Sequence, residues 1–131
     1  MKANVVRRII KRTLELAVMF GAAMAITSMF KIAQVQGNSM NPTLENGDVL
    51  LVSAIGKPDD LDIVIADTRN TDIKADYIVK RYYEDKSDEN GMWLEGDNKE
   101  HSLDSRVLGT FDEDDIIGQA LFNFSKLELL K

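Results

Sequence analysis

The pattern of apolar and polar positions divides the chain into one long apolar run and a later region of short strand-like segments. Uncharged, mostly apolar residues continue without a break from Leu16 to Phe30. With Thr13 to Glu15 included, the segment would be about 27 Å long as a helix, which is near the lower limit for crossing a bilayer. We therefore predict one N-terminal transmembrane helix over residues 13–31.

Beyond residue 31 the pattern is typical of a small β-structure. Short runs of β-branched, aromatic and apolar residues, separated by Gly, Asn and Asp, cover 48–52, 62–66, 77–83, 92–94 and 116–124. No helical pattern of useful length lies between them, which disfavours a parallel α/β fold. We predict a mainly β fold: a small antiparallel β-barrel or sandwich-like domain, preceded by the transmembrane helix.

The distribution of charge gives this arrangement a direction. Residues 1–12 carry five basic residues and no acid, whereas the rest of the chain has 11 basic and 22 acidic residues. Because positive charge favours the cytoplasmic side, we expect a cytoplasmic tail (1–12), an anchor in the lipid bilayer of the cell membrane (13–31) and an extracytoplasmic domain (32–131). The acidic domain argues against nucleic acid as a partner.

A cleavable signal peptide is the alternative for the N-terminal segment, because a basic start and an apolar run also fit that description. The small-residue triplet Ala23-Met24-Ala25 lies inside the apolar run rather than after it, which favours a retained anchor. Gly21 and Ala25 have the spacing of helix-pairing residues, but this spacing is common and the oligomeric state stays open.

Without cysteine there is no disulfide or thiolate metal site, and we expect no metal or cofactor.

Three polar blocks carry the candidate chemistry: Gly37 to Leu44 with Ser39, Tyr77 to Arg81 with Lys80, and Gly96 to Arg106. A serine hydroxyl becomes a good nucleophile only when a neighbouring base removes its proton. In a strand, Lys80 would share a face with Ile78 and Tyr82, where burial disfavours the cation. A base role at pH 7 needs a pKa about three units below the usual value. The alternative is a lysine that pairs with one of the many acids.

His101, the only histidine, is the other candidate base. It lies in a polar segment, and no carboxylate stands at a spacing that would complete a Ser-His-Asp triad. We therefore prefer Lys80 as the base and expect His101 to have a surface or loop-packing role.

The three blocks, in this order behind an apolar run, resemble bacterial type I signal peptidases over almost the whole chain. The resemblance implies a serine endopeptidase that removes signal peptides from exported preproteins, with Ser39 as nucleophile and Lys80 as general base. It further implies that Ser102 orients the lysine amine, with Ser105 as the weaker choice. By the same resemblance, Asp104 and Arg106 brace the site.

The resemblance also suggests how a substrate is held. The backbone N–H of Ser39 is the first oxyanion donor, whereas Gly37 stands where some members have a serine, so a side-chain donor is absent. Family substrates bind as an extended strand with small residues one and three positions before the cleaved bond. The matching pocket positions are Met40, Leu44, Ile78 and Val79; ordinary strand core is the alternative, nearly as favoured for Leu44.

The chain departs from the family pattern in two places. It has Asp60-Leu61-Asp62 where the family usually has an Arg-Gly-Asp turn, and only fifteen residues separate Lys80 from Gly96, which leaves no room for an accessory subdomain.

Two other interpretations stay open. A self-cleaving Ser/Lys protease of the SOS-repressor type uses the same residue pair, although the apolar run replaces its DNA-binding helices. An inactive membrane-anchored β-domain that binds exported peptides is the second; covalent modification of Ser39 by a serine-directed acylating inhibitor would exclude it.

Overall fold

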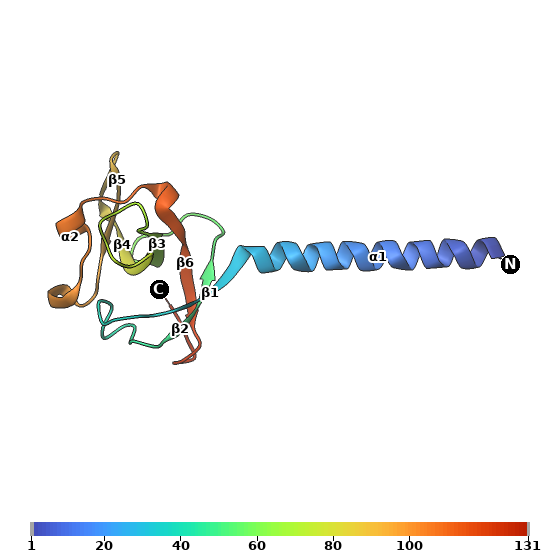
Figure 1. The fold of residues 1–131 in the computed structure, drawn as a ribbon, viewed down its shortest axis with the longest axis horizontal. Coiled ribbons are helices and arrows are strands. Elements are labelled where there is room, and N and C mark those ends of the chain that lie inside the picture. The colour runs from blue at the N-terminus through green and yellow to red at the C-terminus, as the bar shows by residue number, and fades with distance from the viewer. Residues whose placement is uncertain (1, 131) are drawn as a thin grey trace. The chain divides into compact units, whose positions relative to one another are not determined.

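The computed structural model describes residues 2–130 and divides the chain into two units, an N-terminal helix and a β-rich unit that begins at Lys31 (Figure 1). Helix α1 (Lys2–Met29) contains the predicted apolar run except for its last residue, Phe30. Lys11 and Glu15 lie one turn apart on it, with 3.9 Å between Nζ and Oε1.

Among residues 2–130, no helix combines the length and the apolar character needed to cross a membrane. The transmembrane helix predicted over residues 13–31 is therefore not found, although most of that segment is helical. The physical reason is that basic residues and Glu15 occupy the first half of α1, and the helix ends at Met29 because Phe30 begins a strand. The uncharged part, residues 16–29, is about 21 Å long, whereas the hydrocarbon core of a bilayer is about 30 Å thick.

The second unit is built on one antiparallel sheet of seven strands. The strands are β1 (Phe30–Gln34), β2 (Val49–Ser53), β3 (Ile63–Asp67), β4 (Tyr77–Asp88), β5 (Gly91–Glu95), β6 (Ile116–Asn123) and β7 (Glu128–Leu129). Their order is β1-β2-β6-β3-β4-β5, with β7 beside β6. The predicted mainly β, antiparallel class is confirmed, but β1 and β5 are the two ends of the order, so the sheet is not a closed barrel.

Five of these strands, β2 to β6, correspond to the runs predicted from the sequence. The sequence did not predict β1, whose first two residues were assigned to the end of the anchor, or the short β7. Between the strands lie three short helical turns: η1 (Lys99–His101), α2 (Ser105–Leu108) and η2 (Glu113–Asp115).

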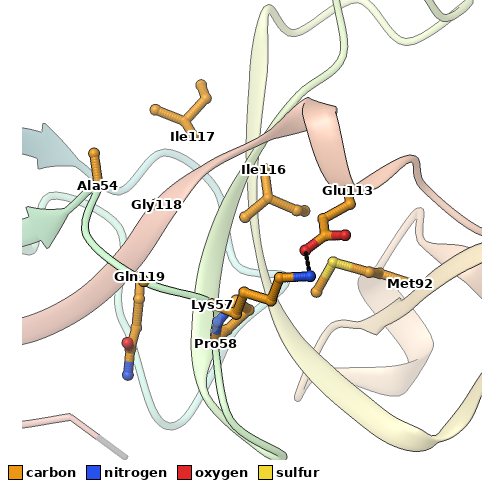
Figure 2. A pocket seen from close by; sticks show the side chains of 10 residues that line it. Ala54, Lys57, Pro58, Met92, Glu113, Ile116, Ile117, Gly118 and Gln119 are labelled. Carbon is orange, nitrogen blue, oxygen red and sulfur yellow. Dashed lines mark ion pairs between the residues drawn. The ribbon is translucent and has the colours of Figure 1, made fainter.

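A small hollow of about 160 Å³ lies where the loop after β2 approaches the start of β6 (Figure 2). Lys57 Nζ pairs with Glu113 Oε1 at 2.5 Å beside it, and both side chains are mostly exposed. None of the residues that the sequence assigns to the active site lines this hollow.

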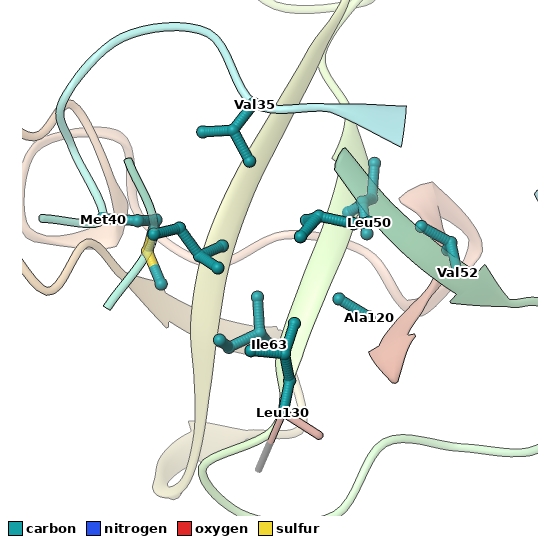
Figure 3. Close-up of a cluster of buried hydrophobic side chains, with 9 residues drawn as sticks. Val35, Met40, Leu50, Val52, Ile63, Ala120 and Leu130 are labelled. Atoms are coloured by element: carbon teal, nitrogen blue, oxygen red, sulfur yellow. The ribbon is translucent and has the colours of Figure 1, made fainter. Parts of the chain in front are cut away.

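The core consists of two apolar clusters that share β3. Alternate residues of a strand point to opposite faces, and Ile63 and Ile65 join one cluster whereas Val64 and Ala66 join the other. The first cluster contains Val35, Met40, Leu44, Leu50, Val52, Ile63, Ile65, Ala120 and Leu130 (Figure 3). Since it includes side chains from the loop between β1 and β2, core packing also fixes that loop.

Candidate active site

Ser39 lies in the loop between β1 and β2, and the side chains that follow it hold the loop in place. Met40 is 1% exposed and Leu44 is fully buried, both in the first core cluster. Thr43 Oγ1 donates a hydrogen bond of 2.5 Å to Asp97 Oδ2, which ties the loop to the third polar block. Half-buried Ser39 is thus held beside the core by its neighbours.

Strand β4 brings Lys80 to Ser39. The register pairs Lys80 with Val64, a fully buried residue of the central strand β3. Ile78 and Tyr82 pack against the same cluster as Val64, whereas Val79 packs against the other cluster, as the predicted alternation requires. The Lys80 side chain is therefore buried, with only 3% of the residue exposed.

The amine of Lys80 and the hydroxyl of Ser39 are in direct contact. Lys80 Nζ donates a hydrogen bond to Ser39 Oγ at 2.7 Å. Burial lowers the pKa of Lys80 to about 8, because desolvation disfavours the cation; the charge of Asp104 opposes this shift and that of Arg106 adds to it. At that pKa about one amine in ten is neutral at pH 7, against fewer than about one in a thousand for an ordinary lysine.

Gly96 allows the third polar block to pack directly on the nucleophile loop. A Cβ added at Gly96 would lie 2.1 Å from Ser102 Oγ and 2.6 Å from the carbonyl oxygen of Ser39. That carbonyl also accepts a hydrogen bond of 2.9 Å from the backbone N–H of Asn98. Only glycine fits this approach without movement of backbone on one side or the other.

Ser102 lies close to the reactive pair, but its contact is with Asp104. Its hydroxyl donates to Asp104 Oδ2 at 2.6 Å, and within residues 2–130 it makes no hydrogen bond to Lys80. The role of orienting the amine, which the resemblance assigns to Ser102, therefore stays a prediction. Ser105 is 2% exposed and its hydroxyl accepts from the backbone N–H of Leu94 on β5, a structural contact away from the amine.

Asp104 is the centre of a buried hydrogen-bond network. Its carboxylate accepts from the backbone N–H of Gly96 at 2.7 Å, from Ser102, and from Arg106 through Nε at 2.9 Å and Nη2 at 2.6 Å. Burial alone would raise the pKa of Asp104, but these donors hold it well below its usual range. Asp104 and Arg106 thus have the contacts that a bracing role requires.

A second ion pair, which the sequence analysis did not identify, braces the other side. Arg81 donates to Asp97 through Nε at 2.9 Å and Nη2 at 2.6 Å, and through Nη1 to the carbonyl of Leu61 at 2.7 Å. Asp97 also accepts the hydroxyl of Thr43. The signal was present, since Arg81 follows Lys80 and Asp97 follows Gly96, but sequence alone did not show that the two meet.

The oxyanion donor predicted at Ser39 is available. The backbone N–H of Ser39 makes no hydrogen bond within residues 2–130, so it can bind the oxygen of an acyl intermediate. Gly37 has φ of +86°, a conformation in which a serine would be strained. Its N–H already donates to Asn46 Oδ1 at 2.9 Å.

His101 lies exposed at the end of η1. Its only hydrogen bond within the described chain is from its backbone N–H to the carbonyl of Asn98. The structure therefore does not bring the histidine to Ser39 or to a carboxylate.

A groove of about 750 Å³ leads to Ser39 and Lys80. Residues of β1 and the following loop line it together with the start of β4 and the preceding loop. Of the predicted pocket residues, Met40, Ile78 and Val79 line the groove. Leu44 is not among the residues that line the groove; its side chain is fully buried in the first core cluster, which agrees with the alternative of ordinary core packing.

Free strand edges border this groove. Strand β4 pairs with β3 from Tyr77 onward but with β5 only from Arg81 onward, so residues 77–80 have one unpaired edge among the described strands. β1 is at the end of the strand order and also has an unpaired edge. An extended peptide can hydrogen-bond to such edges.

Comparison with known proteins agrees with this arrangement. The model of the Peptidase S24-like family matches residues 6–121, a stretch that includes Ser39, Lys80 and all three polar blocks. A search of curated proteins gave no significant match. The family fits a serine peptidase with a Ser/Lys pair, and since its model covers most of the chain, the protein belongs to the Peptidase S24-like family.

Proposed function

We propose that this protein is a serine endopeptidase in which Ser39 is the nucleophile and Lys80 is the general base. The observation that carries the proposal is the 2.7 Å contact between Lys80 Nζ and Ser39 Oγ, with the lysine only 3% exposed. A buried amine with a pKa near 8 supplies enough neutral base at neutral pH to activate a serine.

The reaction takes place in two halves. Neutral Lys80 accepts the proton of Ser39 Oγ while that oxygen attacks the scissile carbonyl, and the N–H of Ser39 stabilises the oxyanion. The C–N bond then breaks as the Lys80 ammonium gives its proton to the leaving amine, which leaves an acyl-serine. Water, deprotonated by neutral Lys80, then attacks the acyl carbon. The bond between that carbon and Ser39 Oγ breaks, and the Lys80 ammonium returns its proton to Oγ, which restores the hydroxyl and releases the new carboxyl end.

We propose that the substrate lies in the groove as an extended strand with small residues one and three positions before the cleaved bond. The apolar side chains of Met40, Ile78 and Val79 support this, since all three line the groove that ends at the reactive pair. Hydrogen bonds to the free edges of β1 and β4 would hold the peptide backbone.

For the substrate class we propose signal peptides of exported preproteins, processed at the extracytoplasmic side of the cell membrane. The support is the likeness of the three polar blocks to type I signal peptidases. Exposed apolar side chains of α1, such as Leu16, Val18 and Phe20, support contact with lipid.

The family assignment fits a second candidate equally well: a Ser/Lys protease that cleaves its own chain. The two candidates differ in where the scissile bond lies. A signal peptidase acts on a second molecule, so its rate depends on the precursor concentration, whereas self-cleavage in one molecule is independent of protein concentration.

Mass spectrometry of the full chain incubated with a purified preprotein separates these outcomes. We expect one cut in the preprotein after a small residue, lost in Ser39→Ala and in Lys80→Ala and retained in Lys99→Ala, which removes an exposed lysine that does not line the groove. Processing by the Ser39 or Lys80 variant would contradict the mechanism. Cleavage of the enzyme alone, at a concentration-independent rate, would select the second candidate; folded wild type that cuts neither chain would refute both.

A further inference from the structure

Two lysines line the groove besides the Lys80 of the reactive pair, and they come from different elements of the fold. Lys31 comes from β1 and Lys74 from the loop before β4, and both line the groove. Along the chain, Lys31 precedes Ser39 and Lys74 precedes Lys80. We call the part of the groove lined by Lys31 and Lys74 the lysine end, and the part lined by Ser39 and Lys80 the reactive end.

These two lysines lack carboxylate partners in a unit that is rich in acids. Six other basic side chains form ion pairs: Lys57, Arg69, Arg81, Lys86, Arg106 and Lys126. Lys80 donates a hydrogen bond to Ser39. Of the lysine and arginine side chains in residues 31–130, only Lys31, Lys74 and Lys99 therefore form neither an ion pair nor a hydrogen bond. Two of these three face the groove, where a bound peptide would meet them.

One carboxylate also lines this end, that of Asp76. Its charge acts on Arg69, whose guanidinium lies 5.5 Å from the centre of the Tyr77 ring. Asp76 therefore has a cationic neighbour of its own, while Lys31 and Lys74 have no anionic partner. The lysine end consequently attracts negative charge.

We propose that the lysine end of the groove selects peptides that carry an aspartate or glutamate about four to six residues from the scissile bond. Five residues separate Lys74 from Lys80, and the strand from Tyr77 to Lys80 alone covers about 10 Å at roughly 3.3 Å per residue. The inference rests on the proposed function, because it requires a peptide strand in the groove. It gives the enzyme a second determinant of specificity besides the small residues at the bond.

Labelled peptides that fill the groove test the proposal without relying on turnover. Each peptide has alanine one and three positions before the scissile bond and no charged side chain except at one test position. The test position carries Glu, Gln or Lys, and it is moved residue by residue along the peptide on both sides of the scissile bond. Fluorescence anisotropy with full-length Ser39→Ala gives Kd. We expect Glu to bind about threefold to tenfold more tightly than Gln within one short stretch, and Lys more weakly, with the difference reduced in about 0.5 M salt.

Variants of the protein identify the residues responsible. Each variant is made in the Ser39→Ala protein. We expect the double change Lys31→Gln and Lys74→Gln to remove the preference for Glu, and the double change Lys31→Glu and Lys74→Glu to produce a preference for the Lys peptide. The control Lys99→Gln should leave the preference for Glu unchanged. A Glu preference that is absent, or that survives the double change, overturns the proposal, as does a failure of every peptide to bind. Charge-dependent binding with no cleavage by wild type would instead refute the proposed function and keep the lysine end as a binding element.

Discussion

The two ends of the groove use lysine in opposite ways. At the reactive end, Lys80 is 3% exposed and its pKa falls to about 8, and two arginine–carboxylate pairs surround it. At the lysine end, Lys31 and Lys74 are exposed to solvent. The comparison shows that burial lowers the pKa of a lysine amine so that it can act as a base. An exposed lysine stays a cation that attracts anionic groups weakly and in a salt-dependent way.

The largest effect is expected when the buried amine is removed. Lys80→Met keeps an unbranched apolar side chain but has no base, so kcat should fall by about a thousandfold or more. The free energy of unfolding should rise by up to about 2 kcal/mol at pH 7, because the cost of desolvating the cation disappears. Peptide cleavage assays and urea denaturation measure the two changes. The control is Lys99→Met, which changes an exposed lysine. The same loss of kcat and the same gain in unfolding free energy in this variant would contradict the distinction between buried and exposed lysine.

Breaking the buried network at the reactive end should have the next largest effect. Asp104→Asn leaves the donors of Gly96, Ser102 and Arg106 without a carboxylate, and we expect a loss of about 3 kcal/mol in unfolding free energy. Since the charge of Asp104 raises the pKa of Lys80, the kinetic pKa of the variant should also move down. Denaturation and a pH–rate profile provide the readouts. The exposed control Asp112→Asn should change neither, and a stable Asp104→Asn protein would contradict the bracing role.

The pH dependence of catalysis should separate the two ends without any mutation. Below the Lys80 pKa of about 8, kcat/KM for an uncharged peptide should rise about tenfold per pH unit and then level off. The free energy of unfolding should also increase with pH. The pKa of Lys80 in the folded state is below the unfolded value of 10.5, so the buried ammonium destabilises the folded state fully below about pH 8 and no longer above pH 10.5. Unfolding free energy should therefore rise with pH across that window. A flat rate profile from pH 6 to 8 would exclude Lys80 as the base.

The sequence was sufficient to predict those features that depend on the order of segments along the chain and on the alternation of side chains along a strand. Runs of β-branched, aromatic and apolar residues predicted β2 to β6, and the positions of Ile78, Lys80 and Tyr82 on one strand face agree with the observed packing. The apolar run was harder to interpret, because Phe30 continues it in composition while β1 begins there. Hydropathy alone does not mark where a helix gives way to a strand.

Contacts between distant segments were beyond the reach of pattern analysis. Whether Leu44 lines the groove or fills the core depends on how the loop packs, and the side chain lies in the core. The meeting of Arg81 with Asp97 and of Ser102 with Asp104 depends on side-chain directions that the sequence does not contain. Both are long-range or orientational properties of the folded sheet.

The smallest expected effect concerns Leu61, in the turn that departs from the family pattern. Leu61 has φ of +69°, a left-handed conformation in which a side chain costs about 1 kcal/mol, and it stands where the resembling family usually has glycine. The turn is nevertheless fixed, since Leu61 N–H donates to the Tyr82 carbonyl at 2.8 Å and its own carbonyl accepts from Arg81.

Leu61→Gly should therefore raise the unfolding free energy, by at most about 1 kcal/mol, because relief of strain exceeds the entropy lost by a flexible glycine and the side chain is already 45% exposed. Leu61→Ala is the matched control: it removes the same exposed side chain, keeps a Cβ at positive φ and should give no gain. Urea denaturation of both variants measures the difference. Because the carbonyl that binds Arg81 is unchanged, kcat/KM should stay within about twofold of wild type. A fall in activity without a fall in stability would mean that the strain itself holds Arg81, and through Asp97 the nucleophile loop, in the reactive geometry.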